Sequence, residues 1–181
     1  MIKQLCTALL ISTVILACSV DKRDESVPQV EQDYPDQESW DATIYLTRMG
    51  KVAGFLKAGH IQKYSQKNMT LLLDSITVDF YNEQGQHTSV LTAWGGKVND
   101  LTQDMLAFGN VVVISDSGVT LFTDTLKWDN QRQKIVSEIP IMITTETGDT
   151  LYGDSFISDT NLQNREITNP RGKSSKRIEL D

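Results

Sequence analysis

Four turn glycines recur along this chain at nearly constant intervals, and each lies between two stretches of alternating apolar and polar residues. They are Gly50, Gly85, Gly118 and Gly148, spaced 35, 33 and 30 residues apart. Repeats of this length are typical of stacked units, none of which buries its apolar face alone. The spacing therefore predicts an all-β fold of stacked antiparallel hairpins with a continuous apolar interior. An ordinary β-sandwich, whose turns also recur at short intervals, is the alternative.

The alternation is clearest at residues 74–81, where Ile76, Val78 and Phe80 share one face. A period of two residues over this length indicates a half-buried strand. Pro140 has no backbone N–H to donate, so it predicts a strand start, an edge or a bulge. Residues 52–66 also allow a helix, and 167–170 resemble the start of a truncated fifth unit. The expected strands are 42–47, 52–64, 74–81, 88–94, 109–114, 119–123, 139–144 and 150–154.

The N-terminus has the pattern of a secretory signal. Residues 5–17 are largely apolar behind a single Lys3, and this stretch is shorter than the roughly 20 residues that span a bilayer. It ends in Ile-Leu-Ala-Cys, a sequence that resembles a bacterial lipobox. We therefore expect a signal peptide at 1–17 and lipidation of Cys18. An ordinary signal peptide with an unused Cys18 is the alternative.

The rest of the chain divides by composition. Residues 18–39 are polar and contain little to bury, which predicts a lipid-anchored, disordered tether. Residues 40–172 form the expected β domain, and 173–181 form a charged tail. The chain has 17 Lys and Arg against 24 Asp and Glu, a net charge of −7. Proteins that bind nucleic acid carry clustered positive charge instead, so this class is excluded.

Catalytic signatures are missing from the sequence. His60 and His87 are the only histidines, and neither belongs to a cluster with metal-ligand spacing. Acidic residues recur with the structural period, as turn-forming aspartates do. We therefore expect no enzyme, no cofactor and no metal. The competing interpretation is a pair of carboxylates such as Asp124 and Asp154 acting on envelope glycan.

An apolar stripe follows the predicted strands. Its members have two possible roles, packed core or the lining of an open groove, and the sequence leaves both open. The candidate groove residues are Ile76, Val78, Phe80, Val111, Val113, Leu121, Ile141, Ile143, Leu151 and Phe156.

Two sets of residues resemble the OstA-like proteins of lipopolysaccharide export. In the later half these are Leu106-Ala107-Phe108-Gly109-Asn110-Val111, Gly118-Val119-Thr120-Leu121 and Thr123-Asp124-x-Leu126-x-Trp128-Asp129. The earlier half is similar to the LptC branch, through the Gly50 turn, Leu56-x-Ala58 and Ile76-x-Val78-x-Phe80-Tyr81 ahead of Gly85. The resemblance covers about residues 42–172.

The resemblance implies a twisted β-jellyroll, open along one edge, whose apolar groove holds acyl chains. It implies a non-catalytic, lipopolysaccharide-binding component of the periplasmic transport bridge. Such a protein receives lipid from an inner-membrane, ATP-driven extractor and passes it to the next OstA-like bridge protein. The implied partners are lipopolysaccharide, the inner-membrane export transporter subunits and that bridge protein, the proteins joining by edge-strand pairing. The alternative is a structural envelope scaffold lipoprotein with a filled β core and no groove.

The anchor departs from the familiar pattern of this family, which is an N-terminal transmembrane helix. Here a lipobox and a tether replace that helix, so the expected location is periplasmic, anchored through Cys18. The family role favours the inner membrane. Ser19 is not the Asp that retains lipoproteins there in some bacteria, so the sorting position permits the outer membrane.

Overall fold

The computed structural model describes residues 34–173, and the regular secondary structure of these residues is almost entirely β-strand. A short 3-10 helix, η1 (Ser65–Lys67), is the exception. The strands are β1 (Gln37–Arg48), β2 (Lys51–Tyr64), β3 (Met69–Tyr81), β4 (His87–Ala93), β5 (Gly95–Asn99), β6 (Met105–Ser115), β7 (Val119–Asp129), β8 (Lys134–Ser137), β9 (Ile141–Thr145), β10 (Thr150–Gly153), β11 (Ser155–Ser158), β12 (Arg165–Thr168) and β13 (Arg171–Lys173).

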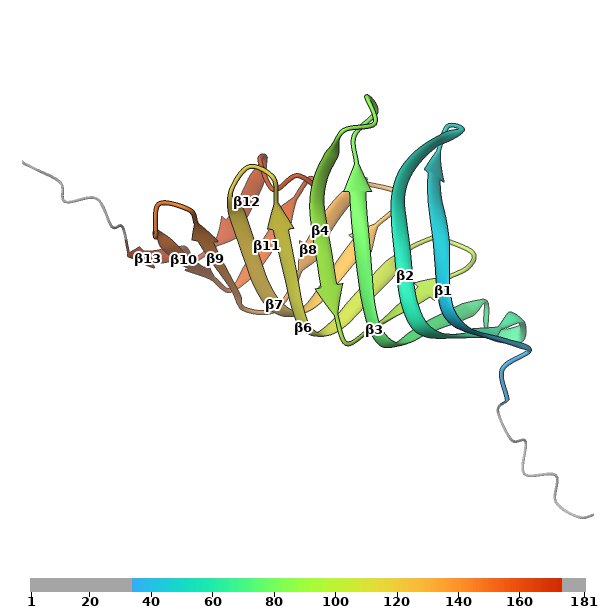
Figure 1. The fold of residues 1–181 in the computed structure, drawn as a ribbon. Helices are drawn as coiled ribbons and strands as arrows, with labels where there is room; N and C mark the ends of the chain where they lie inside the picture. Colours follow the sequence, from blue (N-terminus) through green and yellow to red (C-terminus); the bar gives the residue numbers. More distant parts are fainter. Residues whose placement is uncertain (1–33, 174–181) are drawn as a thin grey trace, which may run out of the picture. The chain divides into compact units, whose positions relative to one another are not determined.

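All of these strands join one antiparallel hydrogen-bonded network. The main path is β1-β2-β3-β4-β6-β7-β8-β11-β12, with β5 between β3 and β6 and with β9, β10 and β13 continuing from β7. Neighbours in the sheet are therefore close in the sequence, and the colours in Figure 1 pass gradually from β1 to β13. The network begins at β1 and ends at β12 and β13.

The network is folded into two layers, because the long strands bend midway and contribute one half to each. Layer A contains 42–48, 51–58, 76–81, 87–93, 111–115, 119–123, 141–145, 150–153 and 171–173. Layer B contains 37–40, 60–64, 69–73, 95–99, 105–108, 125–129, 134–137, 155–158 and 165–168. Apolar side chains from both layers form a single core cluster. The interior therefore lies between the layers along the whole stack.

Two of the corners between the layers are register shifts of the β-bulge kind, one in the β2–β3 pair and one in the β6–β7 pair. The β2–β3 register shifts between Ala58 and His60, opposite Asp74 and Ser75, which have φ values of 58° and 67°. Gly59 is required at this corner, because a Cβ there would lie 2.5 Å from the Asp74 carbonyl oxygen. Such bulges increase the local bend of a strand and redirect it.

The structure explains the glycine repeat. Gly50, Gly85, Gly118 and Gly148 have φ values of 77°, 76°, 81° and 83°, and each ends a layer A hairpin. Glycine adopts these angles without the Cβ penalty that other residues meet. One repeat of 30 to 35 residues is therefore one circuit. The chain leaves a layer A turn, passes a corner into layer B, turns there, and returns past a second corner to the next layer A turn.

The predicted all-β architecture of stacked antiparallel hairpins is confirmed, and several details differ from expectation. Residues 51–64 are a strand, so the helix alternative for 52–66 is wrong. Pro140 directly precedes β9, as a strand start. β1 begins at Gln37, three residues inside the segment expected to be tether, because pairing with β2 satisfies its backbone.

At the other end, β13 pairs with β10 and includes Lys173, the first residue of the expected tail. The strands β5, β8, β11 and β13 were not expected at all. The predicted signal peptide, Cys18, residues 18–33 of the tether and residues 174–181 lie outside the described residues.

Candidate functional site

The candidate groove residues face the interior, as the alternation predicts. Phe80 and Leu151 are partly buried and pack against the core cluster. The other eight are buried, and all except Phe156 belong to layer A: Ile76, Val78, Val111, Val113, Leu121, Ile141, Ile143 and Phe156. They form a line along the stack rather than a compact site.

The C-terminal part of this line is densely filled. Leu121 is 0% exposed and Ile143 is 2% exposed, and these two residues are paired across β7 and β9. Side chains buried to this degree normally pack at the density of an organic crystal. In this half of the interior the candidate residues are packed core.

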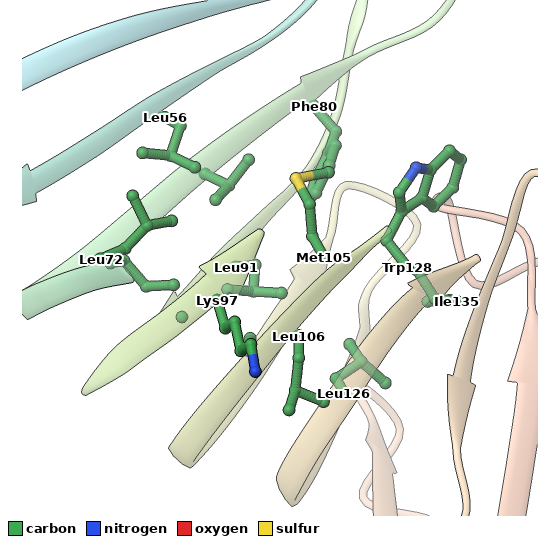
Figure 2. A pocket seen from close by; sticks show the side chains of 14 residues that line it. Leu56, Leu72, Phe80, Leu91, Lys97, Met105, Leu106, Leu126, Trp128 and Ile135 are labelled. Carbon is green, nitrogen blue, oxygen red and sulfur yellow. The ribbon is translucent and has the colours of Figure 1, made fainter. Parts of the chain in front are cut away.

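The N-terminal half contains an apolar pocket of about 50 Å³ between the layers. Figure 2 shows its labelled side chains, which come from β2 to β8 in both layers. Three of its residues, Ile76, Val78 and Phe80, were predicted. The others are Leu56, Leu72, Leu91, Gly96, Lys97, Met105, Leu106, Ala107, Leu126, Trp128 and Ile135.

A larger hollow of about 370 Å³ lies on the open side of the layers, opposite the corners. We call it the mouth. Phe80, Met105 and Trp128 line both the pocket and the mouth, and Figure 2 shows these three side chains at one end of the pocket. The apolar pocket and the mouth therefore adjoin each other, with these three side chains between them.

The mouth is bounded by β1 on one side and by layer B turns on the other. Arg48 is the single charged residue that lines it, and its guanidinium carbon lies 5.8 Å from the centroid of the Trp128 ring. Arg48 ends β1 in layer A, whereas Trp128 lies in the layer B part of β7. This cation–π contact therefore bridges the two layers across the mouth.

The open side is closed in the other half of the stack by the loop 159–164, between β11 and β12. The hydroxyl of Ser89 in β4 donates to the Thr160 carbonyl at 2.8 Å, and that of Ser115 in β6 donates to the Asn161 carbonyl at 2.8 Å. Leu162 is 0% exposed within this loop. Thr160 also lines the mouth, so the loop separates the mouth from the filled half.

The histidines and carboxylates are distributed over the surface. His60 contacts Glu38 at 2.7 Å and stacks on Trp40, whereas His87 lies 2.9 Å from Asp116. Asp124 lies at the β7 corner and Asp154 joins β10 to β11. In residues 34–173 there is no group of three His, Cys, Asp or Glu that could hold a metal.

Two aspartates have shifted pKa values, both for structural reasons. The backbone N–H of Asn130 donates to Asp104 at 3.0 Å and lowers the pKa of that carboxyl, with a further contribution from Lys127. Hydrogen bonds from Asn169 and then Arg171 lower the pKa of Asp154. Both carboxylates tie turns or corners together, which is a structural role.

Sequence reasoning missed the layer B half of the pocket, including Leu72, Leu126 and Trp128. Leu126 and Trp128 are two residues apart in β7, and this alternation could have predicted that both side chains face the interior. No alternation predicts the burial of Leu162, because it is a single leucine in a turn-rich segment. No described helix is long and apolar enough to cross a membrane.

Comparisons with known proteins agree with this geometry. The family model described as "Lipopolysaccharide-assembly, LptC-related" matches residues 5–151. No curated protein sequence matches the chain. Among solved structures, it is similar to LptH, the LptA homologous periplasmic component of the lipopolysaccharide transport device from Pseudomonas aeruginosa. The TM-score is 0.51 at 12% identity, over 69% of this chain and 95% of that one. The likeness confirms the OstA-like β-jellyroll fold, and the family match shows that this chain belongs to the LptC-related family of lipopolysaccharide assembly.

Proposed function

We propose that this protein is a non-catalytic, lipopolysaccharide-binding component of the periplasmic transport bridge. It receives lipid from an inner-membrane, ATP-driven extractor and passes it to the next bridge protein. Membership of the LptC-related family and the fold shared with LptH support this role. The observation that carries the proposal is the apolar pocket between the layers, which adjoins the larger mouth at Phe80, Met105 and Trp128.

The proposed mechanism is passive partition of acyl chains. Moving apolar surface out of water gains roughly 25 cal/mol per Å². The pocket, at about 50 Å³, is smaller than the roughly 150 Å³ cavity that takes one benzene. An entering chain must therefore displace Phe80, Met105 and Trp128 toward the larger mouth. ATP hydrolysis by the extractor drives the movement of lipid, and this protein supplies the apolar surface that holds the acyl chains.

The ends of the stack are suited to pairing with other proteins. β1 pairs only with β2, and β12 pairs only with β11, so each has one edge without a partner among the described strands. Unpaired strand edges are templates for β-augmentation. We assign β1 to the transporter's periplasmic domain and β12 to the next OstA-like protein. Photo-crosslinkers at Thr43 and at Ile167 test this assignment, and crosslinks to neither partner would contradict it.

The proposed anchor is lipid on Cys18, behind the signal peptide 1–17. It places the domain in the periplasm, with the inner membrane favoured by the family role. The measurement is mass spectrometry of the mature N-terminus. An unmodified Cys18, or an N-terminus beyond it, would contradict the anchor.

Photo-crosslinking in cells tests the lipid groove. We expect a photoreactive residue at Phe80 to crosslink to lipopolysaccharide. The control is Asp79, the adjacent residue of β3, whose side chain points to the opposite face. Equal lipid crosslinks from the two positions, or none from Phe80, would contradict the groove.

The alternative function is a structural envelope scaffold with a filled core. The burial of Leu121, Ile143 and their neighbours in the C-terminal half favours it. The two functions differ in lipid content. Lipopolysaccharide that co-purifies with the full chain, and that is lost on substitution of Phe80 by Asp, would exclude the scaffold.

A further inference from the structure

The loop 159–164 is held against the opposite layer by buried polar contacts. Ser89 is 0% exposed and Ser115 is 3% exposed, and both are layer A residues that donate to carbonyls of this layer B loop at 2.8 Å. Within the loop, Asp159 accepts hydrogen bonds from the backbone N–H groups of Gln163 and Asn164. The loop is therefore shaped by its own aspartate and attached to layer A by two hydroxyls.

Leu162 occupies an unusual position in this loop. Each of the four layer B turns contains a non-glycine residue with positive φ, namely Asn68, Gln103, Gln133 and Leu162. Gln103 and Gln133 are exposed and Asn68 is half-buried, whereas Leu162 is fully buried at φ 60°. A left-handed leucine is disfavoured, so burial of its side chain between the layers must offset this cost. Leu162 thus fills interior space that the other turns leave to solvent or to the mouth.

We propose that the loop 159–164 is a displaceable plug, with Leu162 occupying a site that an acyl chain takes when lipid passes toward the C-terminal edge. This inference rests on the proposed function. Thr160 of the loop lines the mouth, so a chain bound there already touches one side of the plug. Beyond the loop the interior is filled, and the lipid path is closed until the loop moves.

If the loop is a plug, lipid reaches the two halves of the interior to different extents, and the two can be measured separately. Phe80 lines the open half, and Leu151 in β10 is a partly buried, inward-facing residue of the filled half. The experiment places a photoreactive residue at each of these positions in the full chain and measures crosslinks to lipopolysaccharide. We expect strong crosslinks from Phe80 and weak crosslinks from Leu151 while the plug is closed.

The test loosens the plug without altering the apolar path. Replacing both Ser89 and Ser115 by Ala removes the hydroxyls that hold the Thr160 and Asn161 carbonyls. Loss of buried hydrogen-bond partners should shift the local equilibrium roughly five- to thirty-fold toward the open loop. The ratio of Leu151 to Phe80 crosslinks should rise by a similar factor.

Ser137→Ala is the matched control. Ser137 is as buried as the other two serines, but its hydroxyl donates to the Ile139 carbonyl at the β8–β9 corner, away from the loop. We expect this variant to leave the crosslink ratio unchanged. If the double variant fails to fold, Leu162→Ala removes the plugging side chain and should raise the ratio in the same direction.

Each outcome decides one of the two proposals. An unchanged ratio in folded Ser89→Ala/Ser115→Ala and Leu162→Ala proteins would overturn the plug and leave the lipid groove standing. Equal crosslinking from Phe80 and Leu151 in the unmodified protein would do the same. Absence of lipopolysaccharide crosslinks from Phe80 in every background would overturn the proposed function, and the plug with it.

Discussion

Phe80 and Ile141 both face the interior, but their surroundings differ. Phe80 is partly buried beside the mouth, whereas Ile141 is 3% exposed in the filled half. A carboxylate at position 80 can reach the mouth, while one at position 141 would be buried without a partner, which costs several kcal/mol. We expect Phe80→Asp to stay folded and lose lipopolysaccharide binding, and Ile141→Asp to unfold. Thermal unfolding and lipid co-purification measure the two effects, and equal melting temperatures would contradict this distinction.

Arg48 reaches across the mouth to the ring of Trp128. Its contact with the Trp128 ring spans the two layers and is worth about 0.5–1 kcal/mol at an exposed site. We expect Arg48→Gln to make Trp128 more accessible, measured by acrylamide quenching in a chain whose Trp40 and Trp94 are replaced by Phe. Arg132→Gln is the control for charge, because Arg132 pairs with Asp129 in a nearby turn. Equal quenching in the two variants would contradict a bridge at Arg48.

The faces of individual residues could be predicted from the sequence, and their packing could not. Period two placed all ten candidate residues toward the interior, because successive strand side chains alternate between faces. Whether an inward residue borders a hollow depends on the distance to the opposite layer, which alternation does not encode. Phe80 and Leu121 have the same pattern in the sequence and different surroundings in the structure.

Corners and turns make different demands on glycine. At the corner, Gly59 lacks room for a Cβ because of the Asp74 carbonyl; at the turn, Gly85 has positive φ and nothing within 4 Å of a built Cβ. We expect Gly59→Ala to lower the free energy of unfolding by about 1–3 kcal/mol, more than Gly85→Ala, which adds only left-handed strain. Urea denaturation compares the two variants. A larger loss at Gly85 would show that the corner relaxes easily.

Asp104 joins two layer B turns through its bond from the Asn130 backbone. Because folding lowers its pKa below 3.8, this carboxylate stabilises the fold above that pH and loses its contribution as pH falls through the folded pKa. We expect Asp104→Asn to be less stable than the unmodified chain at neutral pH, with the difference shrinking below pH 3.8. The urea midpoint measured across this range is the test. If the stability difference between Asp104→Asn and the unmodified chain does not change with pH, the lost stability comes from packing and not from the charge of the carboxylate.

Layer A could be predicted from the sequence far better than layer B. The layer A turns contain glycine, whereas the layer B turns have Asn68, Gln103, Gln133 and Leu162 at positive φ. β5 and β8 have only five and four residues, too few for a convincing alternation. Asp74 and Ser75 show no residue pattern of their own, and the corner glycines, such as Gly59 and Gly109, lack the constant spacing of the turn glycines. The bending of the long strands into two layers could therefore not be foreseen.

At the scale of the molecule, the sequence repeat produces the continuous apolar interior. Every circuit adds a layer A hairpin and layer B strands, and the core cluster continues across them. The resemblance of residues 42–172 to the OstA-like proteins identified the family from this order of elements. The plug could not be predicted in this way, because it depends on contacts from β4 and β6 to a loop more than forty residues later.

The strand order also has a consequence for how the protein is assembled in time. Every strand after β1 pairs with at least one strand that precedes it in the chain. A chain delivered N-terminus first can therefore add each strand to a template that already exists, as repeat proteins propagate from a nucleus. Ser89 and Ser115 are in place before residues 159–164 arrive. The loop that closes the C-terminal half of the open side is thus laid down after every strand except β12 and β13. The nascent domain therefore passes through a stage in which its open side has no cover in either half.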